Sequence, residues 1–162
     1  MLAKTACVVM ITYRPAEDDQ NNIPAQAAEG ERLLRILVVD DHPTNRRVVE
    51  LMLEQVGAEI ASAGNGEEAC LAFEANRFDV VLMDVQMPVM DGLTATRNIR
   101  AYEAERRLGR TPILMLTSNS QPEDAAASHA AGADQHLTKP IYPAVLFSAL
   151  QQAIENDERL AG

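Results

Sequence analysis

The sequence is poor in cysteine, in basic residues and in long apolar runs, and each shortage excludes a class of protein. Its two cysteines, Cys7 and Cys70, form no CxxC pair, so the sequence indicates neither a disulfide framework nor a cysteine-ligated metal site. Lysine and arginine total 14 against 24 aspartates and glutamates, which argues against direct binding of nucleic acid. No apolar run approaches the roughly 18 residues of a membrane span. We therefore expect a cytoplasmic protein with no membrane segment in this chain.

The sequence does contain enough apolar residues for one folded domain with a complete core. Of its 162 residues, 47% are hydrophobic and 23% are charged, so general disorder is not expected. Residues 1–32 differ from the remainder, because "TACVVMITYR" has the composition of a strand and "PAEDDQNNIPAQAAEGE" that of an acidic linker. We predict a strand-like segment and linker at 1–32, either the end of an upstream domain or an addition to this one. A domain at 33–156 and a short tail at 157–162 follow.

From Leu33 onward, short apolar runs alternate with segments of helical spacing. The predicted strands are 35–40, 59–63, 78–84, 112–117 and 134–138, and the predicted helices are 43–57, 66–76, 93–107, 121–132 and 142–156. Thr44 is expected to cap the first helix and Gly57 to end it, while Pro122 and Gly132 mark the two ends of the fourth. Strands that alternate with helices predict an α/β domain whose parallel sheet is covered on both faces.

Polar side chains follow the predicted strands at their carboxyl ends, where ligands bind in sheets of this kind. Three carboxylates that lie close together repel one another, so such a site favours a cation. Oxygen ligands of this kind suit Mg²⁺, and an aspartate can accept a phosphoryl group whose oxygens a lysine and a threonine hold. The side chains concerned are Asp40, Asp41, Asp84, Thr117, Ser118 and Lys139.

Four segments closely resemble the receiver domain of two-component response regulators. They are "LVVDDHPTNRRVV", "VVLMDVQMPVMDGL", "PILMLTSNS" and "HLTKP", and the resemblance covers roughly residues 34–156. The motifs "DVQMPVMDG" and "DDHPTNR" are most similar to receivers attached to hybrid histidine kinases. The resemblance implies a flavodoxin-like, doubly wound sheet of five parallel strands in the order 2-1-3-4-5, with five helices.

The resemblance also implies a role for each site residue that matches a motif. Asp84 would be the phosphoacceptor, and Asp41 would bind Mg²⁺ directly, as Asp84 also would. Asp40 would assist the metal through water, and the backbone carbonyl of Gln86 would complete the protein ligands. The domain would catalyse its own phosphorylation and dephosphorylation.

The remaining matches concern the conformational switch, where the sequence departs from the commonest pattern. Thr117 would be the switch hydroxyl, and Lys139 would contact the phosphoryl group, with Pro140 following it through a bond that is often cis. The family's switch aromatic falls at His136, where Tyr or Phe is usual, so the inward swing of an aromatic ring is in doubt. His136 is then either a variant switch residue or a half-exposed edge-strand residue with no role. Ser118 stands where Ala is common.

Other functions fit the residues less well. A phosphatase of the haloacid dehalogenase type needs a second aspartate where "DDHPT" has His42. The "GNG" at 64–66 is neither a complete glycine-rich fingerprint nor a P-loop. A degenerate receiver that only docks or dimerises would lack an acid, the hydroxyl or the lysine, and none of these is missing.

The sequence leaves two settings for the receiver open. Only "DERLAG" follows Asn156, so no DNA-binding effector is expected after it. We expect the C-terminal receiver of a hybrid histidine kinase, which takes a phosphoryl group from a phosphohistidine and passes it to a phosphotransfer protein. The alternative is a single-domain response regulator that acts by binding other proteins. A histidine kinase, a histidine phosphotransfer protein and a second copy of the chain are the candidate partners.

Overall fold

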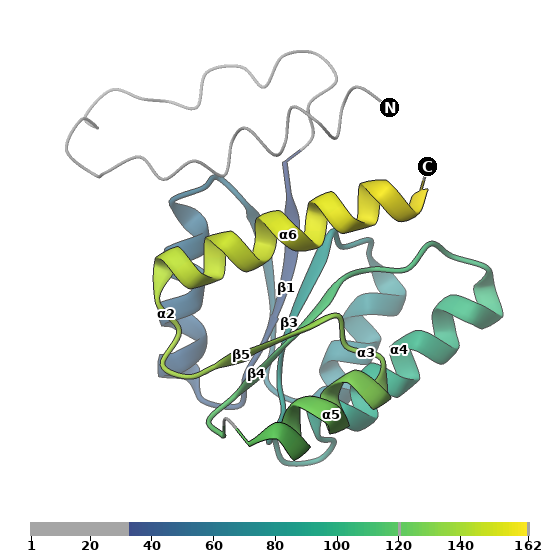
Figure 1. Cartoon of the computed structure of the whole chain (residues 1–162), viewed down its shortest axis with the longest axis horizontal. Helices are drawn as coiled ribbons and strands as arrows, with labels where there is room; N and C mark the ends of the chain where they lie inside the picture. The colour runs from purple at the N-terminus through teal and green to yellow at the C-terminus, as the bar shows by residue number, and fades with distance from the viewer. Residues whose placement is uncertain (1–32, 120, 162) are drawn as a thin grey trace.

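The computed structural model describes residues 33–119 and 121–161, and in this part strands and helices alternate along the chain (Figure 1). The strands are β1 (Arg35–Val39), β2 (Glu59–Ala63), β3 (Val80–Asp84), β4 (Ile113–Thr117) and β5 (Gln135–Thr138). The helices are α2 (Pro43–Glu54), α3 (Gly66–Ala75), α4 (Gly92–Arg106), α5 (Pro122–Ala131) and α6 (Pro143–Ala161). The α/β class predicted from the sequence is confirmed.

The five strands form one parallel sheet in the order β2-β1-β3-β4-β5, which confirms the predicted order. The register pairs Val39 of β1 with Met83 of β3, and Asp84 of β3 with Leu116 of β4. Because the strands are parallel, the carboxyl ends of β1, β3 and β4 lie beside one another at one edge of the sheet. The strand order reverses between β1 and β3, and a doubly wound sheet places ligands at that point.

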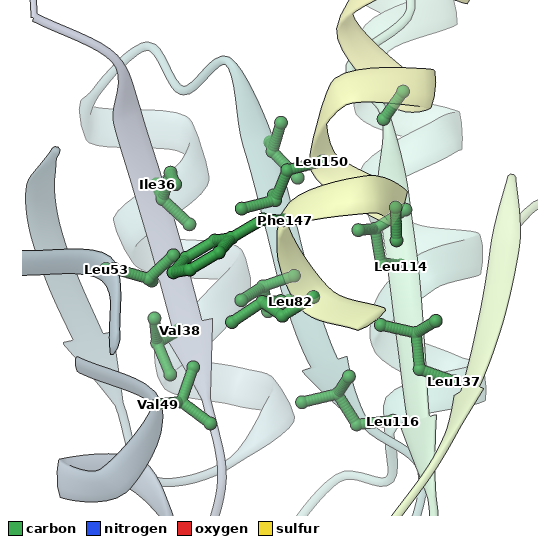
Figure 2. Packing of buried hydrophobic residues seen from close by; sticks show 14 of the residues in the cluster. Ile36, Val38, Val49, Leu53, Leu82, Leu114, Leu116, Leu137, Phe147 and Leu150 are labelled. Atoms are coloured by element: carbon green, nitrogen blue, oxygen red, sulfur yellow. The ribbon is translucent and has the colours of Figure 1, made fainter. Parts of the chain in front are cut away.

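Helices cover both faces of the sheet, as the continuous apolar strands predicted (Figure 1). On one face α2 and α6 pack against the strands, and Figure 2 shows Phe147 of α6 among Ile36, Leu53 and Leu82. On the other face α3 and α4 supply further apolar side chains, Phe73 and Ile99 among them. Every residue of β3 and β4 is buried. The polar residues of these two strands, Asp84 and Thr117, are the last residue of each.

The helix ends confirm the signals of α5 and correct those of α2, which ends at Glu54 rather than at Gly57. Pro122 is the first residue of α5, and Gly132 ends this helix with a left-handed φ of 108°. The expected Thr44 cap is wrong, because α2 begins at Pro43 with His42 as its N-cap residue and no side chain caps the helix. Proline has a φ that already suits the first helical position, so the helix begins one residue before Thr44.

Some expectations lie at or beyond the limits of the described residues. The strand-like segment and linker at 1–32, and Cys7 within them, lie outside these residues. Helix α6 continues to Ala161, whereas the sequence predicted its end at Asn156. Cys70 is partly buried, and its thiol is free. Among the described helices, none is long and apolar enough to cross a membrane.

Candidate functional site

Three carboxylates meet at the carboxyl edge of the sheet, where the sequence predicted them. Asp40 and Asp41 follow β1, and Asp84 is the last residue of β3. One carboxylate oxygen of each lies within 4.8 Å of those of the other two. Asp40 is 2% exposed and Asp84 is 6% exposed, whereas Asp41 is only partly buried. Two of the acids are thus enclosed by protein, and the third is partly exposed to solvent.

The ammonium group of Lys139 lies between two of these carboxylates. Its Nζ is 3.0 Å from Asp40 Oδ2 and 3.3 Å from Asp84 Oδ1. Lys139 follows β5, its backbone N–H donates to the carbonyl of Thr117, and the bond to Pro140 is cis, the form that the family resemblance implied is frequent. In residues 33–162 the sequence has no other lysine. The only ammonium side chain of this part therefore stands at the acid cluster.

The charges in this cluster shift the pKa values of its members. Burial raises the pKa of the Asp84 carboxyl, and repulsion from Asp40 and Asp41 adds to the increase, while the Lys139 ammonium opposes it. Burial also lowers the pKa of Lys139, but its hydrogen bond to Asp40 and the charges of Asp40 and Asp84 outweigh burial, so this pKa is raised. Lys139 is therefore charged at neutral pH, and the Asp84 carboxylate carries an electrostatic cost that a bound cation would offset.

The other residues named from the sequence lie around this cluster. Thr117 ends β4 one residue beyond Leu116, the register partner of Asp84, and its Oγ1 accepts a hydrogen bond of 3.1 Å from the Asn119 N–H. Gln86 lies two residues after β3 with an exposed side chain, and Ser118 is exposed as well.

His136 lies in the edge strand β5, paired in register with Met115 of β4. The residue is partly buried, and its Nε2 is buried without a hydrogen-bond partner in the described part of the chain. The side chain is thus neither fully solvated nor fixed by a polar contact. Both sequence hypotheses for His136, a variant switch residue and a residue without a role, remain open.

Two residues that the sequence reasoning gave no role contact this site. The guanidinium of Arg46 in α2 donates a hydrogen bond of 2.8 Å to the backbone carbonyl of Asp40. Gly92 begins α4 directly against β3, because a Cβ at this position would lie 2.0 Å from the backbone oxygen of Asp84. The glycine in "MDG" was a signal for this close approach, but the neighbour that it touches depends on the fold.

We expect Gly92→Ala to destabilise the domain and to displace the Asp84 backbone. The added methyl group would meet backbone atoms that cannot move aside easily, and overpacking of this kind costs about 1–3 kcal/mol. Urea denaturation of the variant measures the loss. Gly109→Ala is the matched control, because a Cβ there meets nothing within 4 Å, and its unfolding midpoint should not fall. Equal stability of the two variants would contradict the close approach.

We expect Asp84→Asn to stabilise the domain in metal-free buffer at pH 7. The raised pKa means that the charged Asp84 destabilises the folded state, a cost that is absent below the ordinary carboxyl value of 3.8 and sets in as the pH rises above it. Asparagine removes this charge, while Lys139 keeps its bond to Asp40. The gain should be of the order of 1 kcal/mol, a usual size for a single substitution, and should shrink toward low pH. Urea denaturation at pH 7 and pH 5 tests this, and a less stable variant at pH 7 would contradict it.

A cleft of about 650 Å³ lies elsewhere, lined by Arg35, Phe73, Tyr102 and Pro112 among others. None of the site residues predicted from the sequence lines it. Arg35 and Pro112 stand at the amino ends of β1 and β4, so this cleft is at the opposite edge of the sheet from the acid cluster. This cleft is therefore separate from the acid cluster around Asp84.

Comparison with known proteins gives a consistent family. A family model described as the response regulator receiver domain matches residues 36–151. The sensor protein GacS of Pseudomonas syringae pv. syringae is 46% identical over 110 residues, which are 68% of this chain and 12% of that protein. The chain thus spans only a small share of the length of this curated relative.

Two solved structures share the fold. The receiver domain of the sensor histidine kinase PA1611 from Pseudomonas aeruginosa PAO1, solved with a magnesium ion coordinated in its active-site cleft, is 39% identical. It matches with a TM-score of 0.68 over 76% of this chain and 99% of that one. A co-crystal structure of the Saccharomyces cerevisiae phosphotransfer protein Ypd1 with the receiver domain of Ssk1 matches at 25% identity and a TM-score of 0.71. That match covers 75% of this chain and 88% of the other.

Proposed function

The chain belongs to the response regulator receiver domain family of two-component signalling, and from this premise we propose that Asp84 is its phosphoacceptor. The observation that carries the proposal is the position of the Lys139 ammonium, within 3.3 Å of Asp84 and 3.0 Å of Asp40, beside the partly buried Asp41. A buried carboxylate beside a fixed cation and two further acids has the parts that phosphoryl acceptance needs, which are positioning and charge neutralisation.

The proposed reaction moves a phosphoryl group from a phosphohistidine to Asp84. The N–P bond of the donor breaks as a bond forms between an Asp84 oxygen and phosphorus, and the product is an acyl phosphate. Lys139 then holds a phosphoryl oxygen by charge and hydrogen bond, and the Thr117 hydroxyl donates to another. Release of the group to water or to a second histidine would return the carboxylate.

The donors at this site suit Mg²⁺, because all of them are oxygens and three are carboxylates within 4.8 Å. We propose Asp41, Asp84 and the Gln86 carbonyl as direct protein ligands, with Asp40 assisting through water. When bound, the ion supplies positive charge that offsets the repulsion among the acids and the charge of the incoming phosphoryl group. The magnesium ion in the cleft of the PA1611 receiver supports this assignment.

We further propose that the chain from residue 33 to the end of α6 is the receiver of a hybrid histidine kinase in the cytoplasm, preceded by a strand-like segment and linker at 1–32. The similarity to sensor kinases, such as GacS, supports the assignment to a hybrid kinase. The co-crystal structure with Ypd1 supports a histidine phosphotransfer protein as partner. A single-domain regulator that acts by binding other proteins is the second candidate.

Labelling with a small-molecule phosphodonor tests the proposed chemistry. Acetyl phosphate with Mg²⁺ should add one phosphoryl group to the purified chain, as read by intact-mass spectrometry, and a chelator should prevent it. We expect Lys139→Ala to slow labelling about tenfold or more, because a hydrogen bond to a charged group contributes about 1.5–3 kcal/mol. Its Mg²⁺ affinity should persist, since the carboxylates remain. Unchanged labelling of the variant, or a complete loss of Mg²⁺ binding, would contradict this division of roles.

A further inference from the structure

Val89 is the most exposed large apolar side chain among the described residues, with an exposed fraction of 75%. It lies in the loop 85–91, which joins β3 to α4. Both ends of this loop lie at Asp84, because the Gly92 N–H donates to the Val85 carbonyl and Gly92 packs on the Asp84 backbone. The loop is therefore a short excursion on the rim of the acid cluster, with Val89 near its middle.

The backbone of Val89 is left-handed, with a φ of 69°. A side chain branched at Cβ crowds the backbone in this region, so valine is among the residues least suited to it. The Met90 N–H donates to the Pro88 carbonyl over 2.8 Å, which closes a γ-turn centred on Val89. The Met90 carbonyl in turn accepts from the Gly66 N–H over 3.0 Å. Hydrogen bonds at both polar groups of the Met90 backbone thus hold the turn at Val89.

Arg107 is the other non-glycine residue with a positive φ in the described chain, and its conformation has a structural cause that Val89 lacks. Arg107, at φ 54°, is the C-cap residue of α4, and its N–H bonds to the Glu103 and Ala104 carbonyls. The end of the helix accounts for that conformation. No comparable purpose inside the domain explains a branched apolar side chain at position 89, because glycine or asparagine would adopt the turn without crowding.

We propose that Val89 is a specificity-determining contact for the protein phosphodonor that reaches Asp84, an inference that rests on the proposed function. Asp84 is 6% exposed and the Lys139 side chain is 22% exposed, so a protein that presents a histidine to this recess must cover its rim. The loop 85–91 is part of that rim. An exposed valine offers apolar surface to a protein, whereas a small phosphodonor or a metal ion gains nothing from it.

Two variants separate a partner contact from a role inside the domain. Val89→Asn relieves the crowding of the backbone and removes the apolar contact. Val89→Ile keeps a side chain that is branched at Cβ and apolar, so it retains the crowding and the contact. We expect Val89→Asn to unfold at a higher urea concentration than the wild type and to accept from acetyl phosphate at the same rate. From phosphorylated Ypd1, used as the protein donor, it should accept about five- to tenfold more slowly. Val89→Ile should match the wild type with both donors.

Each other outcome overturns a stated part of the proposal. Equal rates of acceptance from phosphorylated Ypd1 by the wild type and Val89→Asn would show that Val89 does not contact the donor. Equal slowing with both donors, or a lower stability of Val89→Asn, would place the role of Val89 inside the domain. Acceptance from acetyl phosphate but not from Ypd1 by the wild type would exclude this class of partner. Acceptance from neither donor would instead contradict the proposed function itself.

Discussion

Replacement of Asp84 by asparagine is expected to abolish phosphorylation of the chain by acetyl phosphate and Mg²⁺. The amide has nearly the shape of the carboxylate but lacks the charged oxygen that would attack phosphorus. The fold should survive, since the buried charge of Asp84 is a cost to the folded state. Intact-mass spectra of wild type and variant under the same conditions measure the effect, which should be a complete loss of the labelled species.

The matched control for this variant is Asp91→Asn, in the same loop. Asp91 caps α4 through a hydrogen bond of 2.7 Å from the Thr94 N–H, and asparagine caps helices about as well as aspartate. This control should be labelled like the wild type. Labelling of Asp84→Asn at the wild-type rate, or loss of labelling in Asp91→Asn with an intact fold, would show that the acceptor lies elsewhere.

Replacement of Arg100 by alanine is expected to destabilise the domain strongly, although Arg100 lies away from the site. Its guanidinium donates to Glu103 Oε2 and the Thr111 carbonyl over 2.8 Å each. It also donates to Asp134 Oδ2 over 2.8 Å and to the Gly132 carbonyl over 2.9 Å. The arginine thereby joins α4 to the segments before β4 and β5. Without it the buried Glu103 loses its cation, and breaking such a pair costs about 3–5 kcal/mol.

Urea denaturation measures this loss, and two further variants interpret it. Arg47 pairs with Glu50 and Glu54, but its side chain is 57% exposed, so Arg47→Ala should lower the unfolding midpoint far less than Arg100→Ala does. The double variant Arg100→Met, Glu103→Met should recover part of the loss, because it leaves no unpaired buried charge. Similar stabilities of Arg100→Ala and Arg47→Ala would contradict the importance of the Arg100 contacts.

The sequence predicted the sheet well because its signals are local and redundant. The apolar runs of β1, β3 and β4 are long enough to be buried on both faces, and Pro122 and Gly132 mark the ends of α5 by their backbone preferences. The meeting of Asp40, Asp41 and Asp84 followed from strand direction alone. Weaker local signals failed, as at Thr44, where the preceding proline began the helix first.

Contacts between distant segments could not be predicted in the same way. The sequence placed Lys139 at the same end of the sheet as the acids, but it did not show which carboxylates the ammonium contacts, Asp40 over 3.0 Å and Asp84 over 3.3 Å. Arg100 contacts residues in two loops further along the chain, and no periodic pattern in the sequence indicates these contacts. The left-handed backbone of Val89 contradicts the preference of valine, so propensity argues against it. In each case the position of a second segment of the folded chain decides the outcome.

Chemical trapping of the phosphorylated residue tests the central claim most directly. Borohydride reduces an acyl phosphate of aspartate to homoserine, a stable product that peptide mass spectrometry can locate. After labelling with acetyl phosphate and Mg²⁺, we expect homoserine at position 84, and at no other aspartate. Reduction at Asp40 or Asp41 would move the acceptor to a different carboxylate. A labelled chain that borohydride leaves unchanged would show that no aspartyl phosphate forms, and would contradict the account.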